Sequence, residues 1–255
     1  MTKLQKAKDL LKSIESTEVL VAFSGGKDSI VTLDLCCEMF ERVEAFYMYI
    51  VKDLNFVNSF LDPLAEKYEI KLHRVPHYIL CQAYKLGLYT INYSFQESEL
   101  RLSDVETYIK AKTGIEWIAN GARKADSIER LAMLSNNGGI DRNTHKVYPI
   151  AEWKAEDVRS YLRLRNLPLP ENQGKKMSGV DLCPETLCWI QENHPSDFEK
   201  IKNIFPFVEA PVKRKEFLLK RGESVPVPVD PPAKKKRGKK SLDKTNTRVE
   251  DKTLA

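Results

Sequence analysis

The sequence predicts an α/β protein built on a doubly wound, mainly parallel sheet with helices on both faces. Short apolar runs alternate with segments of helical periodicity along the first two-thirds of the chain, which is the pattern of strands joined by crossover helices. Of the 255 residues, 42% are hydrophobic and 30% are charged, the balance of a globular protein with a substantial core. No apolar run is long enough to span a membrane.

The expected order of the elements follows from this alternation. Residues 1–17 lack the apolar core of a signal peptide and predict an amphipathic helix. Strands are expected at residues 18–23, 43–50, 70–75, 117–121 and 147–150. Helices are expected at residues 29–41, 54–68 with an interruption at Pro63, 103–113 and 155–165. Five cysteines are too few and too odd in number for a secreted disulfide scaffold, so we expect a cytoplasmic protein.

Composition divides the chain into three parts. Residues 1–170 carry the sheet pattern, residues 171–225 predict a C-terminal helical subdomain, and residues 226–255 form a basic tail. Residues 233–255 hold nine Lys or Arg and three Asp or Glu, so they contribute +6 to a chain whose net charge is +5. Few apolar residues lie in this tail, and we expect it to be disordered. It is either a salt-dependent contact for nucleic acid or a solvated tail that aids solubility.

A glycine-rich turn lies between the first expected strand and the next helix. It reads Ser24-Gly25-Gly26-Lys27-Asp28-Ser29. The two glycines let the backbone approach an anion closely, and the amides at the start of the helix favour phosphate. The two serine hydroxyls can donate to phosphate oxygens, and Lys27 supplies positive charge. Asp28 either caps the helix or helps to hold a magnesium ion. The turn is not a Walker A loop, because Val21 stands where that motif has its first glycine.

This turn resembles the PP-loop of the adenine nucleotide alpha-hydrolase-like superfamily. Residues 121–130 contain Gly121, Arg123, Asp126, Ser127 and Arg130. Their spacing resembles the G-x-R-x-x-(D/E)-S-x-x-R segment of the phosphoadenosine phosphosulfate (PAPS) reductase and sulfate adenylyltransferase small-subunit branch. Residues 147–162 resemble the P-L-x-x-W-x-x-x-D-V-W-x-Y-L stretch of the same branch. Together the three segments extend the resemblance over residues 15–170.

The second segment places cations where open parallel sheets bind their ligands, at the carboxyl end of a strand. Arg123 and Lys124 follow directly after an expected strand, and a guanidinium there can hold phosphate or sulfate with two hydrogen bonds. Arg130 is expected about two turns along the following helix and completes the nucleotide-binding set. The alternative is that these side chains form surface ion pairs with Asp126 or Glu129.

The resemblance implies an enzyme of nucleotidyl or sulfur metabolism that binds ATP or PAPS. The leading hypothesis is cleavage of ATP between the α- and β-phosphates, with release of pyrophosphate and activation of an unidentified acceptor. Lys27, Asp28 and Arg123 would then be catalytic, with Mg²⁺ at Asp28. One alternative is a thiol-dependent PAPS reductase or sulfur transferase. Another is a DNA-associated regulator that binds nucleotide without turnover. A homo-oligomer is compatible with all three.

The cysteines depart from the pattern of the sulfite-forming PAPS reductases. Their C-terminal Glu-Cys-Gly-(Leu/Ile)-His segment does not occur in this sequence. Cys183 and Cys188 are candidates for a zinc or iron–sulfur site, for a redox or sulfur-carrying thiol, or for plain structural cysteines. The Cys36-Cys37 pair is expected to pack in the core. His77, near the end of the third strand, either lines the substrate site or is a satisfied or solvated histidine.

Overall fold

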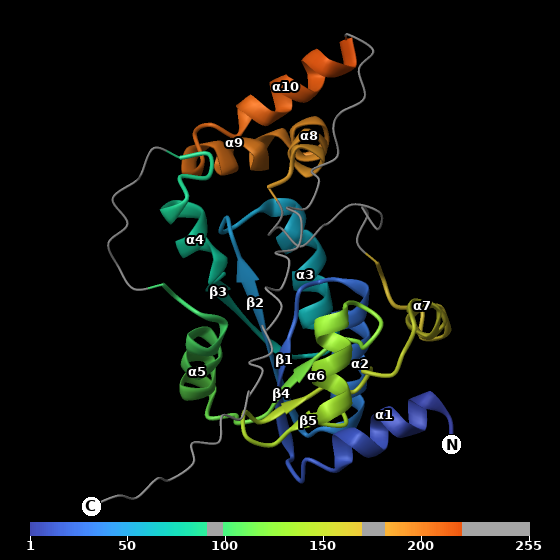
Figure 1. Cartoon of the computed structure of the whole chain (residues 1–255). Coiled ribbons are helices and arrows are strands. Elements are labelled where there is room, and N and C mark those ends of the chain that lie inside the picture. The colour runs from blue at the N-terminus through green and yellow to red at the C-terminus, as the bar shows by residue number, and fades with distance from the viewer. Residues whose placement is uncertain (91–98, 170–181, 221–255) are drawn as a thin grey trace, which may run out of the picture.

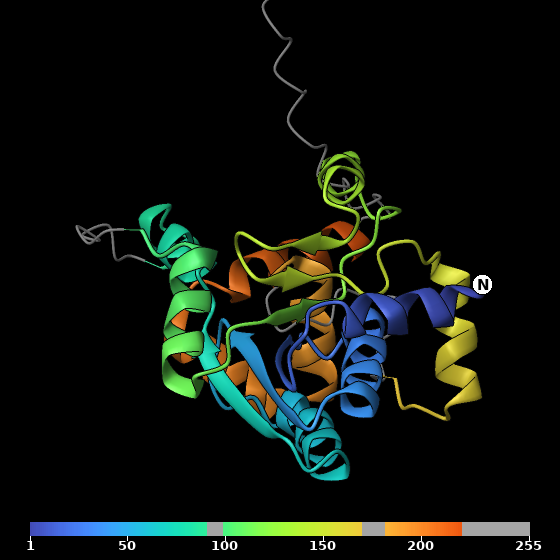
Figure 2. The same ribbon diagram turned by 90° about the horizontal axis from the view of Figure 1, so that it is seen from below.

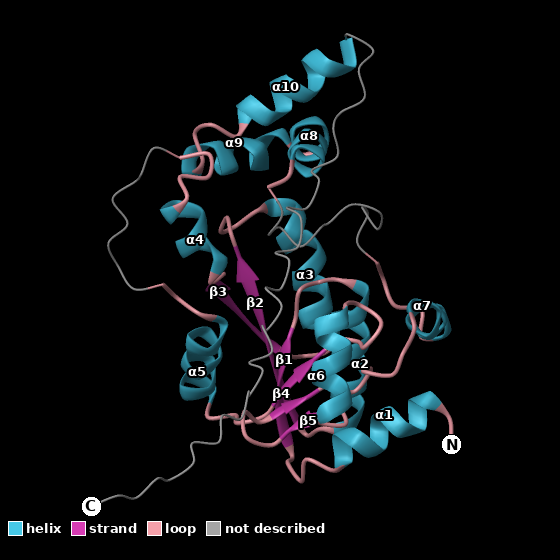
Figure 3. Ribbon diagram, in the orientation of Figure 1, coloured by secondary structure: helices cyan, strands magenta, loops and turns pink. Residues whose placement is uncertain are grey.

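A six-stranded sheet forms the centre of the molecule (Figures 1 and 3). The computed structural model describes residues 1–90, 99–169 and 182–220; the tail at 226–255 lies outside them, so its expected disorder stays a prediction. The strands are β1 (Glu18–Ala22), β2 (Arg42–Tyr49), β3 (Lys71–Pro76), β4 (Ile118–Asn120), β5 (Ile140–Asp141) and β6 (Lys146–Val147). Their order is β3-β2-β1-β4-β6-β5, and β5 runs antiparallel to β6 while the other neighbouring pairs are parallel. The predicted α/β fold is confirmed.

Helices cover both faces of the sheet, as predicted (Figure 2). They are α1 (Lys3–Lys12), α2 (Lys27–Met39), α3 (Asn55–Lys67), α4 (Ile79–Lys85), α5 (Leu102–Thr113), α6 (Ile128–Asn136), α7 (Ala155–Leu164), α8 (Pro184–Asn193), α9 (Pro195–Ile204) and α10 (Glu209–Lys220). Successive residues of a strand point to opposite faces. Val19 and Val21 therefore pack in the core with α1, α2, α3 and α7, whereas Leu20 packs with α5. Within the described ranges, no helix has the length and apolar character needed to cross a membrane.

Two local expectations were wrong in detail. The helix α3 runs through Pro63 without a break. Proline removes one N–H and its hydrogen bond, but Leu61 and Leu64 on either side of it are buried in the core, and this burial keeps the helix continuous. The strand expected at 147–150 ends at Val147, because the chain turns there toward α7.

A buried carboxylate on α2 joins α7 and the end of α3 to that helix. Asp34 on α2 accepts hydrogen bonds from the hydroxyls of Tyr68 and Tyr161, each at 2.6 Å, and from Arg165 Nε at 2.9 Å. Burial by itself raises the pKa of Asp34, but the hydrogen bonds from these three partners outweigh it and hold the pKa below its ordinary value. The carboxylate is thus kept ionised where α2, the end of α3 and α7 meet.

The C-terminal helices α8, α9 and α10 form a layer beyond the carboxyl ends of β1 and β2 (Figure 1). Their core contains Leu187, Ile190, Phe198, Ile201, Phe205 and Val208. The same cluster takes in Leu54 and Phe56 at the start of α3 and Ala83 of α4. The helices expected after residue 170 are therefore present, and they share a core with the body of the fold.

Candidate functional site

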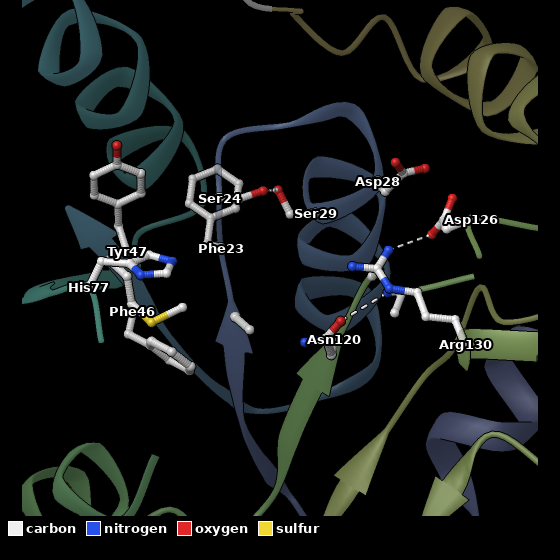
Figure 4. A pocket seen from close by; sticks show the side chains of 14 residues that line it. Phe23, Ser24, Asp28, Ser29, Phe46, Tyr47, His77, Asn120, Asp126 and Arg130 are labelled. Carbon is white, nitrogen blue, oxygen red and sulfur yellow. Dashed lines mark hydrogen bonds and ion pairs between the residues drawn. The ribbon is translucent and has the colours of Figure 1, made fainter. Parts of the chain in front are cut away.

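A cavity of about 330 Å³ opens at the carboxyl ends of β1, β2 and β4 (Figure 4). The chain leaves β1 for β2 on one side and reaches β4 on the other, so the cavity lies where open α/β sheets bind their ligands. Four of the predicted binding residues line it: Ser24, Asp28, Ser29 and Arg130. The predicted loop and the predicted β4 segment therefore meet at one site.

The loop between β1 and α2 has the conformation that its glycines permit. Gly25 has φ +73°, a value that side-chain-bearing residues rarely adopt. A Cβ atom at Gly25 would lie 3.0 Å from Leu61 Cδ2 on α3. The Ser24 hydroxyl donates to Ser29 Oγ at 3.2 Å, and Ser29 Oγ donates to the Gly26 carbonyl at 2.9 Å. This geometry presents two hydroxyls and the start of α2 to the cavity.

Charged side chains stand at the first turn of α2. The Lys27 ammonium lies 2.6 Å from Asp28 Oδ2, and the Lys27 side chain is about one-third exposed. Lys27 does not line the cavity, but its long side chain reaches toward solvent beside the loop. Asp28 Oδ1 is buried without a hydrogen-bond partner among the described residues. A carboxylate oxygen is the kind of ligand that Mg²⁺ prefers, but both Asp28 oxygens face protein cations here, Oδ2 the Lys27 ammonium and Oδ1 the Arg123 guanidinium.

The second loop, between β4 and α6, gathers two arginines on one carboxylate. Asp126 Oδ1 accepts from Arg123 Nη2 at 2.6 Å. Asp126 Oδ2 accepts from Arg130 Nη1 at 2.9 Å (Figure 4). Arg130 lies in the first turn of α6, not two turns along it as expected, because Ser127 caps this helix and starts it at Ile128. The ion pairs with Asp126 that were the alternative to nucleotide binding do form. Arg130 nevertheless lines the cavity.

Arg123 joins the two loops. Its guanidinium is almost fully buried and lies with Nε 3.0 Å from Asp28 Oδ1. The geometry does not make a hydrogen bond of this contact, so Arg123 Nε and Nη1 are buried without a hydrogen-bond partner among the described residues. Arg123 does not itself line the cavity, so its guanidinium lies behind the wall that Asp28 and Asp126 form. Lys124 lies outside the cavity lining and pairs with Glu152.

Comparison with known families agrees with this geometry. The family model described as the phosphoadenosine phosphosulfate reductase domain matches residues 18–173. These residues include the sheet, both loops and the cavity.

The chain belongs to the PAPS reductase domain family. The resemblance drawn from the motifs is confirmed, and with it the place of this chain in the adenine nucleotide alpha-hydrolase-like superfamily. An uncharacterized protein from Methanocaldococcus jannaschii is 24% identical over 189 residues, which are 72% of this chain and 44% of that protein. The chain thus spans less than half the length of this relative.

Three solved structures of low sequence identity resemble the chain. A PAPS reductase from Candida auris has a TM-score of 0.45 at 13% identity and covers 65% of this chain and 82% of that one. An FMN adenylyltransferase from Candida glabrata in complex with ATP has a TM-score of 0.45 at 17% identity, covering 66% and 56%. An NH3-dependent NAD synthetase from Campylobacter jejuni has a TM-score of 0.46 at 13% identity, covering 89% and 99%.

None of the five cysteines of this PAPS reductase domain protein is among the described residues that line the cavity. Cys36 is buried in α2, and burial raises its pKa well above the ordinary value. Cys183 occupies the N-cap position of α8, and burial raises the pKa of Cys188 within that helix. In the described part of the chain, no three His, Cys, Asp or Glu side chains gather as a metal site. Cys183 and Cys188 therefore lack further metal ligands there.

Sequence reasoning missed the role of Gly121 in the family segment. A Cβ at Gly121 would lie 2.9 Å from the carbonyl carbon and oxygen of Asp28 and 3.0 Å from Thr32 Oγ1. Only glycine fits between β4 and the first turn of α2. The signal was present in the sequence, since Gly121 opens the second motif, but its packing partner became visible only in the fold.

The opposite wall of the cavity carries His77 together with Phe46 and Met48 of β2. The Ile79 N–H donates to His77 Nδ1 at 3.1 Å, which leaves the proton of the neutral ring on Nε2. Burial lowers the pKa of His77, and the neutral form is favoured. His73 lies elsewhere: it is buried and contacts Glu44 at 2.5 Å. Of the two histidines, His77 is the one at the site.

Proposed function

We propose that this protein binds ATP in the cavity and cleaves it between the α- and β-phosphates, activating an acceptor and releasing pyrophosphate. The observation that carries the proposal is a group of donors gathered at one cavity: the hydroxyls of Ser24 and Ser29, the start of α2 and the Arg130 guanidinium, with Arg123 paired to Asp28 between the two loops. Such a group is matched by the oxygens of a phosphate chain. The membership of the PAPS reductase domain family supports an adenine nucleotide as the ligand.

The cavity offers different surroundings to the two ends of a nucleotide. Ala22, Phe46 and Met48 supply an apolar wall suited to a base, and His77 adds a hydrogen-bond donor beside it. Ser24, Ser29 and the start of α2 supply hydroxyl and amide donors suited to phosphates. We therefore assign the base to the β2 side and the phosphates to the loop side.

In the proposed reaction, a nucleophilic atom of the acceptor attacks the α-phosphorus. The bond from that phosphorus to the bridging α–β oxygen breaks, and the electron pair leaves with pyrophosphate. Arg123 and Lys27 would stabilise the negative charge that develops on the departing oxygens. For this, the Lys27 ammonium must turn from Asp28 toward the phosphates, which its exposed side chain allows. Asp28 Oδ2 would then be available to hold Mg²⁺, which would neutralise phosphate charge when bound, while Oδ1 stays paired with Arg123.

The second candidate is reduction of PAPS by a thiol, and family membership is the observation that favours it. Against it stands the position of the cysteines: none of the five lines the cavity. A cysteine with a pKa raised by burial, as for Cys36 and Cys188, is also a weak nucleophile. These two observations favour ATP cleavage.

The deciding experiment supplies the purified protein with Mg²⁺ and either ATP or PAPS, with dithiothreitol present in both. Pyrophosphate and AMP are assayed in the first reaction and sulfite in the second. Candidate acceptors, including hydroxylamine as a small nucleophile, are added to the ATP reaction. The variants are Lys27→Ala, Arg123→Lys and Cys188→Ser, with Lys124→Ala as the matched control because Lys124 pairs with Glu152 outside the cavity.

Pyrophosphate from ATP, lost in Lys27→Ala and Arg123→Lys but retained in Cys188→Ser and Lys124→Ala, is the expected result. Sulfite from PAPS that disappears in Cys188→Ser would overturn the proposal in favour of the reductase. Tight ATP binding without any product over the full set of acceptors would instead support a nucleotide-binding regulator.

A further inference from the structure

The N-terminus of α3 is capped by a side chain from the far end of the chain. The Asp197 carboxylate, which is 1% exposed, accepts the Phe56 N–H through Oδ2 at 2.9 Å. Leu54, at the N-cap position of α3, offers no side-chain hydrogen bond. A carboxylate at a helix N-terminus also interacts favourably with the helix dipole. Asp197 of α9 thus supplies the cap that the local sequence lacks.

Further contacts fix this cap in place. The Lys200 ammonium donates to Asp197 Oδ1 at 2.9 Å and to the Asp53 carbonyl at 2.6 Å. The Phe56 ring stacks on His194 at 5.0 Å and meets Trp189 edge-on at 5.7 Å. The start of α3 is therefore held by hydrogen bonds with Asp197 and Lys200 of α9 and by aromatic packing with Trp189 and His194. The ion pair between Lys200 and Asp197 lies within α9.

The helix α3 in turn packs against the loop at residues 24–29 between β1 and α2, which we call the phosphate loop. Leu61 and Phe60 lie 3.0 Å and 3.8 Å from the position that a Gly25 Cβ would take. Ser24 and Gly25 border a narrow cleft whose other side is formed by α3 residues, among them Phe56 and Leu61. Because protein interiors are closely packed, a shift of the first turns of α3 changes the space in which the loop can settle.

We propose that Asp197 is a positioning residue for the phosphate loop and acts through α3. The C-terminal helices then serve as a brace: they hold α3 against Ser24 and Gly25 and keep the loop in the shape that receives phosphate. The proposal rests on the nucleotide site proposed above, and it assigns to the C-terminal helices a part in nucleotide binding.

The test compares ATP affinity and hydrogen exchange in full-length variants. In Asp197→Ala, the α3 amides lose their cap, so part of the binding free energy is spent on ordering the loop. We expect ATP to bind about fivefold more weakly by calorimetry. Exchange measured by mass spectrometry should rise in residues 24–29 and 55–60 and stay unchanged in β4. Asp197→Asn, which retains an acceptor oxygen, should show a smaller loss.

Two more variants separate positioning from general destabilisation. Lys200→Ala leaves Asp197 in place on Phe56 and provides a milder variant if Asp197→Ala does not fold. Glu106→Gln removes a buried ion pair with Lys146, 2.7 Å long, on the α5 face of the sheet away from α3. It should lower stability without changing ATP affinity or loop exchange.

The proposal is overturned if Asp197→Ala binds ATP like the wild type with unchanged loop exchange, or if Glu106→Gln weakens ATP binding equally. A wild type that binds no ATP would contradict the proposed function instead. The exchange data would then still decide whether Asp197 holds the loop.

Discussion

The two loops that frame the cavity reach their shapes by different means. The first, between β1 and α2, depends on backbone conformation: Gly25 has φ +73° and packs against α3. The second, between β4 and α6, is tied by side chains: Asn120 accepts the Ala122 N–H at 2.9 Å and Asp126 accepts the Arg123 N–H at 2.9 Å. The first loop packs against a neighbouring helix, in addition to its hydroxyl hydrogen bonds. The second loop is fixed by hydrogen bonds from its backbone N–H groups to its own side chains.

Because of this difference, the two loops should be sensitive to different kinds of substitution. The first loop depends on the positive φ of Gly25 and on packing against α3 for its shape. In the second loop, the Asp126 carboxylate orients Arg123 and Arg130 before any ligand binds. Such preorganised charges are what the stabilisation of a developing charge requires. Changes of backbone freedom should therefore damage the first loop, and changes of charge should damage the second.

The largest effect is expected where the loops touch. Gly121→Ala would place a Cβ 2.9 Å from the Asp28 backbone, so β4 and α2 must separate. We expect a loss of about 3 kcal/mol in the free energy of unfolding, measured by urea denaturation. Gly26→Ala is the control, because its Cβ would meet only Ser24 Oγ at 3.4 Å. Equal stability of the two variants would show that the loops are not in close contact.

The second loop should respond most to loss of its carboxylate. Asp126→Ala removes the acceptor of three donors: the Arg123 N–H, the Arg123 guanidinium and the Arg130 guanidinium. We expect a stability loss of about 2 kcal/mol and weaker ATP binding by calorimetry, since both arginines lose their orientation. Asp141→Ala, at an exposed turn far from the cavity, should leave ATP affinity unaltered. An Asp126→Ala protein with wild-type affinity would contradict the preorganised second loop.

The first loop should respond to loss of backbone freedom. Gly25→Ala forces a side chain into the left-handed region and toward Leu61, and we expect about 1–2 kcal/mol of destabilisation. ATP affinity should fall further than stability alone explains if the loop amides bind the phosphates as proposed. Gly114→Ala has a similar positive φ with open space around its Cβ. It serves as the control for backbone strain at a site remote from the ligand.

The smallest effect is expected at the wall opposite both loops. Burial lowers the pKa of His77, so the folded protein resists protonation more than the unfolded chain does. The His77 contribution to stability is therefore present above the unfolded pKa of about 6.5 and is lost as the pH falls through the lower folded pKa. Between pH 7.5 and pH 5.5 the wild type should lose slightly more stability than His77→Gln, by less than about 1 kcal/mol. Identical pH profiles in urea denaturation would contradict a neutral, buried imidazole.

Much of the fold could be predicted from the sequence because the signals are local. The apolar run before Ser24 and the glycine pair after it specify a strand, a tight turn and a helix within a few residues. The order of strands and helices follows from the same alternation. The residues after 220, and the domain boundaries at 170 and 225, remain predictions from composition.

Other features could not be predicted because their partners are distant in the chain. The residues around Leu54 do not indicate that Asp197 caps α3. Likewise, the residues around Asp34 do not indicate that Tyr161 and Arg165 form hydrogen bonds with it. Such contacts depend on which elements the sheet order brings side by side, and a long-range hydrogen bond leaves no periodic trace in the sequence.

The sequence by itself determined that a tight glycine turn follows the first strand and leads into a helix, since glycine conformation acts over a few bonds. It also determined that arginines follow a later strand. Only the tertiary structure decided that Arg123 meets Asp28 and that Gly121 packs on the same turn. The physical reason is that β1 and β4 become neighbours only when the sheet forms. The carboxyl ends of the two strands then bring the two loops to one cavity.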